Sequence, residues 1–179
     1  YMPRVKSFLG IDPSQLVLNR GRSGQPAGHV WFVDYDVVRD GLVVEGARVV
    51  FRVNNGNLIQ YGSENFPPPT AKVPATRLSK QQAAAVVARF IGGFQLGDAY
   101  RDTGSLHLMP SAVVNNKFSE GFEFANGRGL VKVWQFIFHR DGVMGTWRAR
   151  VDATTGEVLE LTDVNDYVSA QVNGGTYLN

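Results

Sequence analysis

Two pairs of carboxylates in this chain have the type and spacing for acid–base or calcium chemistry. Asp34 and Asp36 lie two positions apart in an alternating segment, so they share one face of a predicted strand. Asp152 and Glu157 lie on the two sides of a predicted turn. Either pair has the groups for general acid–base catalysis or for binding calcium. Carboxylates on hairpins are usually solvated, so we interpret both pairs first as exposed surface groups; catalysis by Asp34 and Asp36 would need a basic residue beside them.

Other residue types that serve enzymes lack their motifs. The histidines His29, His107 and His139 are scattered and form no H-E-x-x-H or other metal-ligand spacing, so we interpret them as structural. No serine lies in G-x-S-x-G, and no glycine-rich phosphate loop opens a helix. The absence of cysteine excludes disulfides, cysteine zinc sites and thiol nucleophiles. We therefore assign no catalytic, cofactor-binding or metal-binding residue and expect no cofactor.

Four arginines are the candidate partner-docking residues. They are Arg48, Arg52, Arg148 and Arg150, and they alternate with apolar residues in two similar predicted strands. They would therefore lie on the faces opposite the apolar side chains, as a small cationic stripe on each sheet. A solvated sheet face is the simpler interpretation. A docking surface for an acidic partner is the alternative.

Composition limits the classes of partner. The chain has 179 residues, of which 44% are hydrophobic and 19% charged, enough apolar material for a real core. A formal net charge of +2 is too small to indicate a nucleic-acid partner. No apolar run approaches the roughly 18 residues that a spanning helix needs. We expect neither nucleic acid nor membrane as a partner.

The first part of the chain reads as a short helix followed by strands. Asp12 as N-cap and Pro13 at the first helical position predict a helix that continues through Leu18. Residues 30–37, 47–53 and 58–62 alternate at the period of strands. Asp40-Gly41 and Asn55-Gly56 predict the turns between them.

A proline-rich stretch separates this part from a second one. Residues 63–78 contain four prolines, which exclude a regular helix and disfavour an interior strand. Ser79 and Gln82 then form a predicted capping box for a helix that stops at Gly92-Gly93. Residues 94–129 show only fragments of strand character, at 105–109 and 121–125. Strands are predicted again over 131–140, 146–151 and 157–161.

The two strand-rich regions resemble one another weakly. Arg39-Asp40-Gly41 follows a strand that contains Trp31, and Arg140-Asp141-Gly142 follows one that contains Trp134. A duplicated unit and chance similarity between antiparallel hairpins both explain this echo. With a duplication, each half would be a helix followed by an antiparallel sheet.

Two stretches resemble a known family of pro-regions. Gly28-His-Val-Trp-Phe, followed by Gly41-Leu-Val-Val-Glu-Gly-Ala and a strand ending in Asn-Asn-Gly, resembles the fungalysin/thermolysin propeptide (FTP) motif. The helix after Leu78 and the ending Thr146-Trp-Arg-Ala-Arg-Val-Asp-Ala-Thr-Thr-Gly-Glu-Val-Leu resemble a PepSY domain. Together the resemblances cover most of residues 10–165.

The resemblance implies an α+β fold of two cystatin-like units, each a helix packed on an antiparallel sheet. It divides the chain into an FTP-like subdomain (1–66), a proline-rich linker (67–78), a PepSY-like subdomain (79–165) and a junction toward a catalytic domain (166–179).

It also implies a function. The chain is expected to be the non-catalytic pro-region of a secreted zinc metallopeptidase of the thermolysin or fungalysin type, acting as an intramolecular chaperone and inhibitor. Its partner would be the catalytic domain of that peptidase, and its location secreted or extracytoplasmic. The zinc-binding helix of such enzymes is missing from this sequence. A stand-alone extracytoplasmic module of the same fold that binds peptides or proteins is the alternative.

Overall fold

The structure is a computed structural model that describes residues 11–67, 71–111 and 129–165. Its elements are η1 (Pro13–Gln15), β1 (Leu16–Leu18), β2 (Gly24–Ala27), β3 (Val30–Arg39), β4 (Leu42–Asn54), β5 (Asn57–Glu64), α2 (Lys80–Phe90), β6 (Ala99–Ser111), β7 (Gly129–Arg140), β8 (Val143–Asp152) and β9 (Val158–Asp163). None of the helices in these ranges is both long and apolar enough to cross a membrane.

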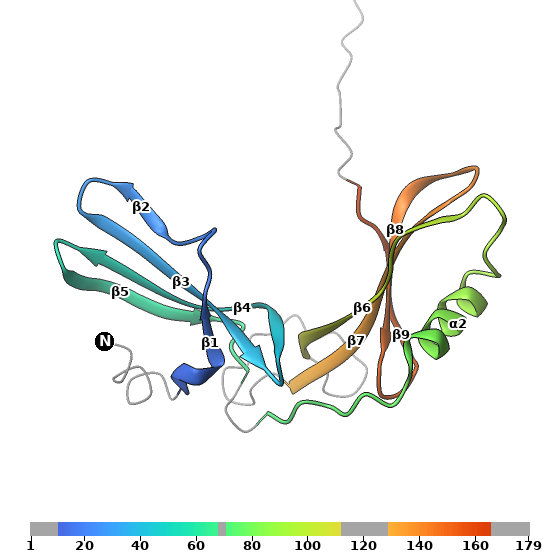
Figure 1. The fold of residues 1–179 in the computed structure, drawn as a ribbon, viewed down its shortest axis with the longest axis horizontal. Coiled ribbons are helices and arrows are strands. Elements are labelled where there is room, and N and C mark those ends of the chain that lie inside the picture. The colour runs from blue at the N-terminus through green and yellow to red at the C-terminus, as the bar shows by residue number, and fades with distance from the viewer. Residues whose placement is uncertain (1–10, 68–70, 112–128, 166–179) are drawn as a thin grey trace, which may run out of the picture.

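The strands form one mixed sheet with two limbs (Figure 1). The path through the sheet is β1-β3-β4-β6-β7-β8-β9, with β2 also beside β3 and β5 beside β4. All pairs are antiparallel except β4 with β6, which meet in parallel at Val44 and Leu108. Strand β4 therefore joins the N-terminal limb, β1 to β5, to the C-terminal limb, β6 to β9.

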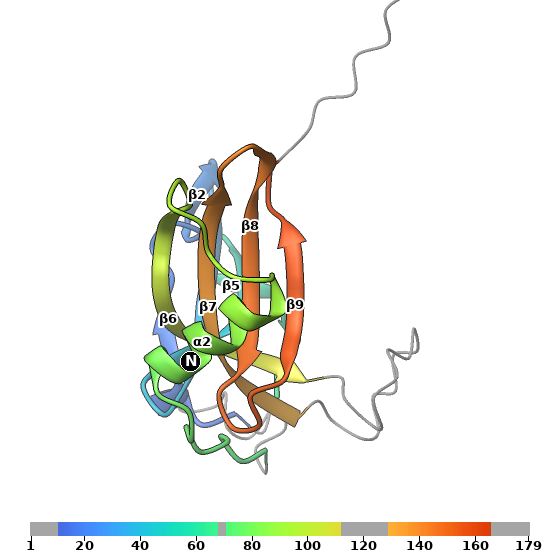
Figure 2. The same ribbon diagram turned by 90° about the vertical axis from the view of Figure 1, so that its right-hand side faces the viewer.

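The expected pair of cystatin-like, helix-on-sheet units is wrong. The molecule is mostly β-sheet, and α2 is the only α-helix of the described residues; it lies across the C-terminal limb (Figure 2). In the N-terminal limb, Asp12 caps only the 3₁₀ turn η1. Residues Leu16–Leu18 then form β1, because they pair with β3 from Tyr35 to Val37. The long-range ladder overrides the local helix signal.

Other local predictions are confirmed. The capping box is present, since Ser79 Oγ accepts from the Gln82 amide at 3.3 Å and Gln82 Oε1 accepts from the Ser79 amide at 2.8 Å. The predicted strands correspond to β3, β4, β5, β7, β8 and β9. The fragment 105–109 lies in the longer strand β6, while the fragment 121–125 and the junction 166–179 lie outside the described residues. The domain boundaries stay predictions.

Two apolar cores lie on one side of the bent sheet, here called the covered face. One core contains Val37, Val44 and Val49 of the N-terminal limb with Leu108 and Leu130; the other places Phe136 and Phe138 under α2. Leu130, Phe136 and Phe138 occupy alternate positions of β7, so both cores share this face. The segment 71–78 crosses the same side: Ala71 and Val73 pack on the first core. The opposite side is the open face, on which no described helix packs.

Candidate functional site

The open face of the N-terminal limb carries an ion-pair cluster centred on Asp34. Only 2% of Asp34 is exposed, and its carboxylate accepts hydrogen bonds from Arg52 at 2.5 Å and Arg48 at 3.5 Å. Arg48 also makes two 2.8 Å bonds to Glu64. Hydrogen bonding between Arg48 and Glu64 lowers the pKa of Glu64 and raises the pKa of Arg48. Asp36 pairs instead with Arg22.

The expectation that Asp34 is a solvated surface group is therefore wrong. Asp34, Arg48 and Arg52 belong to adjacent strands and share one face, so the guanidinium groups replace water around the carboxylate. A basic residue does lie beside Asp34, but as an ion-pair partner. The cluster resembles a structural ion-pair network.

The open face of the C-terminal limb carries the other two predicted arginines. Arg148 bonds Glu160 through Nη2 at 2.6 Å. Arg150, 7% exposed, bonds Gln135 Oε1 at 3.0 Å and Glu45 Oε2 at 2.8 Å, and lies 3.3 Å from Glu160.

Both pairs of arginines thus lie opposite the apolar cores, as the alternation predicts, and the bent sheet gathers them on one open face. Each of the four is already paired with at least one carboxylate. The face is therefore a mixed-charge surface rather than a cationic stripe. Docking of an acidic partner by these arginines stays a prediction.

The second carboxylate pair does not converge. Asp152 Oδ1 accepts from the backbone amides of Thr154 and Thr155 and so caps the turn, while Glu157 is exposed. In the described ranges, no group of three or more histidine, aspartate or glutamate side chains has the geometry of a metal site.

The histidines differ in their surroundings. His29 is exposed in a turn, and the His139 ring contacts the Gly145 carbonyl at 2.7 Å within its own hairpin. His107 is different, because its Nδ1 lies 2.6 Å from Glu45 Oε1 and its Nε2 lies 2.7 Å from Ser105 Oγ. Sequence reasoning missed this chain of polar contacts, since Glu45 belongs to the other limb and no motif joins them.

An exposed apolar surface lies on the covered-face side of the N-terminal limb, beyond the first core. We call it the distal patch. The strand register aligns Trp31 with Val53 and Leu58, and Val33 with Phe51 and Tyr61. Trp31 is 48%, Leu58 40% and Tyr61 50% exposed. Every position in these two rows is aromatic or aliphatic, because the charged residues that alternate with them, such as Asp34 and Arg52, point to the open face.

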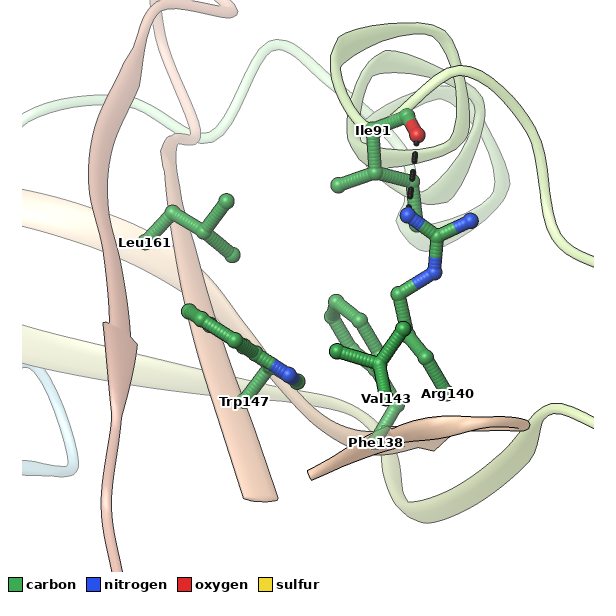
Figure 3. Close-up of a pocket in the computed structure, with 6 residues that line it drawn as sticks. All are labelled: Ile91, Phe138, Arg140, Val143, Trp147 and Leu161. Atoms are coloured by element: carbon green, nitrogen blue, oxygen red, sulfur yellow. Dashed lines mark hydrogen bonds between the residues drawn. The ribbon is translucent and has the colours of Figure 1, made fainter. Parts of the chain in front are cut away.

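A small hollow lies between the end of α2 and strands β7, β8 and β9 (Figure 3). It is lined by Ile91, Phe138, Arg140, Val143, Trp147 and Leu161 and has a volume of about 160 Å³. Arg140 donates to the carbonyls of Ile91 at 3.2 Å and Gly93 at 3.3 Å and so stabilises the helix C-terminus. The volume of this hollow is below the several hundred Å³ of typical ligand pockets. We assign no ligand to it.

Comparison with known proteins shows no family for this chain. The sequence matches no family profile and no curated protein. Among solved structures, the Bacillus megaterium YpeB C-terminal domain is similar at 15% identity and a TM-score of 0.42, over 92% of this chain. The chain spans 64% of that protein. This likeness is too remote to carry a functional argument.

Proposed function

We propose that this chain is a non-catalytic, extracytoplasmic pro-region that assists the folding of a thermolysin- or fungalysin-type metallopeptidase and inhibits it. Two stretches of the chain carry the motifs that resemble such pro-regions. The FTP-like residues 28–56 supply strands β3 and β4, and the PepSY-like ending supplies β8 and the turn into β9. Both stretches therefore form part of the sheet.

The distal patch is the observation that carries the proposal. It exposes Trp31 on β3 of the FTP-like motif, and Leu58 and Tyr61 on the neighbouring strand β5, without a charged side chain among them. Burial of apolar surface contributes roughly 25 cal/mol per Å². A preformed sheet face of this kind would stabilise a partly folded catalytic domain in its folding transition state. Inhibition follows while the chain stays bound and limits access to the cleft.

The first experiment is to read the coding sequence downstream of Asn179 for an H-E-x-x-H helix with a later glutamate, and to express that catalytic domain alone. We expect its refolding yield to rise when the chain is added in trans, and its activity to be inhibited below micromolar concentration. The double variant Trp31→Ser/Tyr61→Ser should weaken both effects at least tenfold. Met144→Ser is the matched control, because Met144 is 82% exposed but lies in the other limb.

Two results would overturn the proposal. One is the absence of any metallopeptidase downstream. The other is a catalytic domain that folds at the same rate and yield, and stays fully active, with or without the chain. Either result would favour the alternative, a stand-alone extracytoplasmic module that uses the distal patch to bind peptides or proteins.

A further inference from the structure

Strand β5 is an open edge of the sheet within the described residues. It pairs with β4 on one side, and no described strand pairs with it on the other (Figure 1). The strand has eight residues, contains neither proline nor lysine, and ends in its only charged residue, Glu64. Its pairing with β4 has one register shift, near Leu58, and is regular from Gln60 to Glu64. Such an edge presents backbone N–H and C=O groups with which another extended chain can pair.

The other edges of the described sheet are protected against an added strand. Strand β1 has three residues, and β2 has four, with Pro26 among them. Strand β9 carries Glu160 and Asp163. Strand β6 has two register shifts before the point at which it meets β4. Short strands, proline, charged side chains and bulges all discourage pairing at an edge. Strand β5 is therefore the long edge that is open over a regular stretch.

Apolar side chains occupy one side of β5. The two rows of the distal patch end on this strand, at Leu58 and Tyr61, which are 40% and 50% exposed. A strand added beside β5 would extend both rows by one position. Aliphatic or aromatic residues at those positions would bury apolar surface, whereas charged residues would lose contact with water without gaining a partner. The added strand should therefore be apolar on this side.

The other side of β5 is acidic at one end. Asp36, Arg48 and Glu64 lie opposite one another on β3, β4 and β5, so charge alternates along this row. The Glu64 side chain is the last of the row and is 53% exposed. A basic side chain opposite Glu64 would continue the alternation, while an acidic one would meet a like charge. Glu64 and Tyr61 are three positions apart and point to opposite sides, so the added strand needs the same spacing.

We propose that β5 binds an extended peptide segment of a partner protein as an added antiparallel strand, with a basic residue opposite Glu64 and an apolar residue three positions later, opposite Tyr61. Antiparallel pairing is favoured because it is slightly more stable per residue than parallel pairing. Main-chain hydrogen bonds to the open edge supply affinity, and the two side-chain positions fix the register. This inference does not depend on the proposed function, since a segment with this pattern fits the edge whichever protein supplies it.

A synthetic peptide tests the proposal. The probe is dye-labelled Lys-Thr-Thr-Val-Thr-Thr-Val, its binding to the full chain is followed by fluorescence anisotropy, and a second probe has Glu in place of Lys. We expect the Lys peptide to bind with a Kd below about 1 mM, and about fivefold more tightly than the Glu peptide, the ratio that cross-strand charge pairs supply. Glu64→Lys should reverse this preference. Glu157→Lys is the matched control, because Glu157 is exposed outside β5 and its replacement changes the net charge equally, and it should keep the native preference.

A second measurement locates the bound peptide. In heteronuclear NMR spectra of the full chain, the Lys peptide should shift the amide signals of residues 57–64 more than those of residues 158–163 at the other end of the sheet. Ile59→Lys places a charge on the β5 edge and should weaken binding, because lysine discourages strand addition. Val17→Lys is its matched control on β1 and should bind as the native chain does, since Ile59 and Val17 are similarly exposed, at 60% and 53%.

Four results would overturn the proposal. The Lys peptide may fail to bind below about 1 mM, Glu64→Lys may leave the charge preference unchanged, or the shifted signals may lie outside β5. The fourth is a dimer in sedimentation experiments that Ile59→Lys dissociates, because a second copy of the chain would then occupy the edge.

Discussion

The Asp34 carboxylate lies 2.5 Å from the Arg52 guanidinium on the neighbouring strand, and the two side chains are 3% and 19% exposed. Removing one member of a buried pair leaves the other charge without compensation. We expect Asp34→Asn to lower the free energy of unfolding by about 3 kcal/mol, the lower end of the range for buried pairs, because Arg48 and Arg52 keep some contact with water. Urea denaturation measures the change.

Asp36→Asn is the control for that variant. Asp36 lies two positions after Asp34 in the same strand and pairs with Arg22. The side chains of Asp36 and Arg22 are 21% and 46% exposed. Exposed pairs contribute little, so we expect a loss of about 0.5 kcal/mol. Equal losses in the two variants would contradict the assignment of Asp34 as the buried centre of the cluster.

Removing the charge of Arg39 should increase the stability of the fold, the opposite of the effect expected at Asp34. Arg39 is 6% exposed, none of its guanidinium nitrogens has a hydrogen-bond partner within the described part of the chain, and burial lowers its pKa. Its guanidinium lies 5.5 Å from the centre of the Phe66 ring. Because an unpaired buried charge is costly, we expect Arg39→Met to raise the free energy of unfolding by about 1–2 kcal/mol. Arg39→Lys, which keeps the charge, should give no such gain, and a loss of stability in Arg39→Met would contradict this account.

Asp98 should contribute to acid sensitivity. Hydrogen bonds from the backbone amides of Gln95 and Asp141 lower the pKa of Asp98 below its ordinary value of 3.8, and the charge of Arg140 acts in the same direction. A lowered pKa stabilises the folded chain above the unfolded value, and this stability is lost as pH falls through the folded value. Asp98→Asn should therefore lower Tm at pH 7, and its difference from the native chain should shrink below about pH 4.

Thermal unfolding between pH 7 and pH 3 measures that difference. Asp141→Asn is the matched control, because its exposed side chain changes while its backbone amide still donates to Asp98. A difference between Asp98→Asn and the native chain that stays constant over this range would contradict the prediction.

Gly104 is the glycine whose replacement should cost most. Its φ is +119°, and an added Cβ would lie 2.6 Å from Lys80 Cδ and 2.8 Å from Cε1 of the fully buried Phe136. We expect Gly104→Ala to destabilise by about 2–3 kcal/mol through strain and overlap together. Gly142→Ala, at φ +69° with nothing within 4 Å, carries the strain alone and should cost about 1 kcal/mol. Chemical denaturation compares them, and equal costs would show that the contact with Phe136 relaxes freely.

Some elements could be predicted from the sequence because the residues that stabilise them are close together in the chain. The Ser79–Gln82 capping box begins α2 because both partners lie within one helical turn. The Asn55-Gly56 turn joins β4 to β5 because both residues adopt positive φ, at 48° and 77°. Alternation also placed the four arginines opposite the apolar cores, because the period of a strand fixes the face of every side chain.

Tertiary structure decided the features that depend on distant partners. Residues Leu16–Leu18 have a helical start signal at Asp12, yet they form β1 because strand β3 offers them a ladder. Asp34 is buried because two arginines of β4 surround its carboxylate. Glu45 meets His107 and Arg150 only because β4 crosses from one limb to the other. Periods, caps and turns could be predicted from the sequence, because they depend on interactions between near neighbours. Pairing between strands far apart in the chain decided the bent sheet and its polar contacts, since those energies exist only once the strands are side by side.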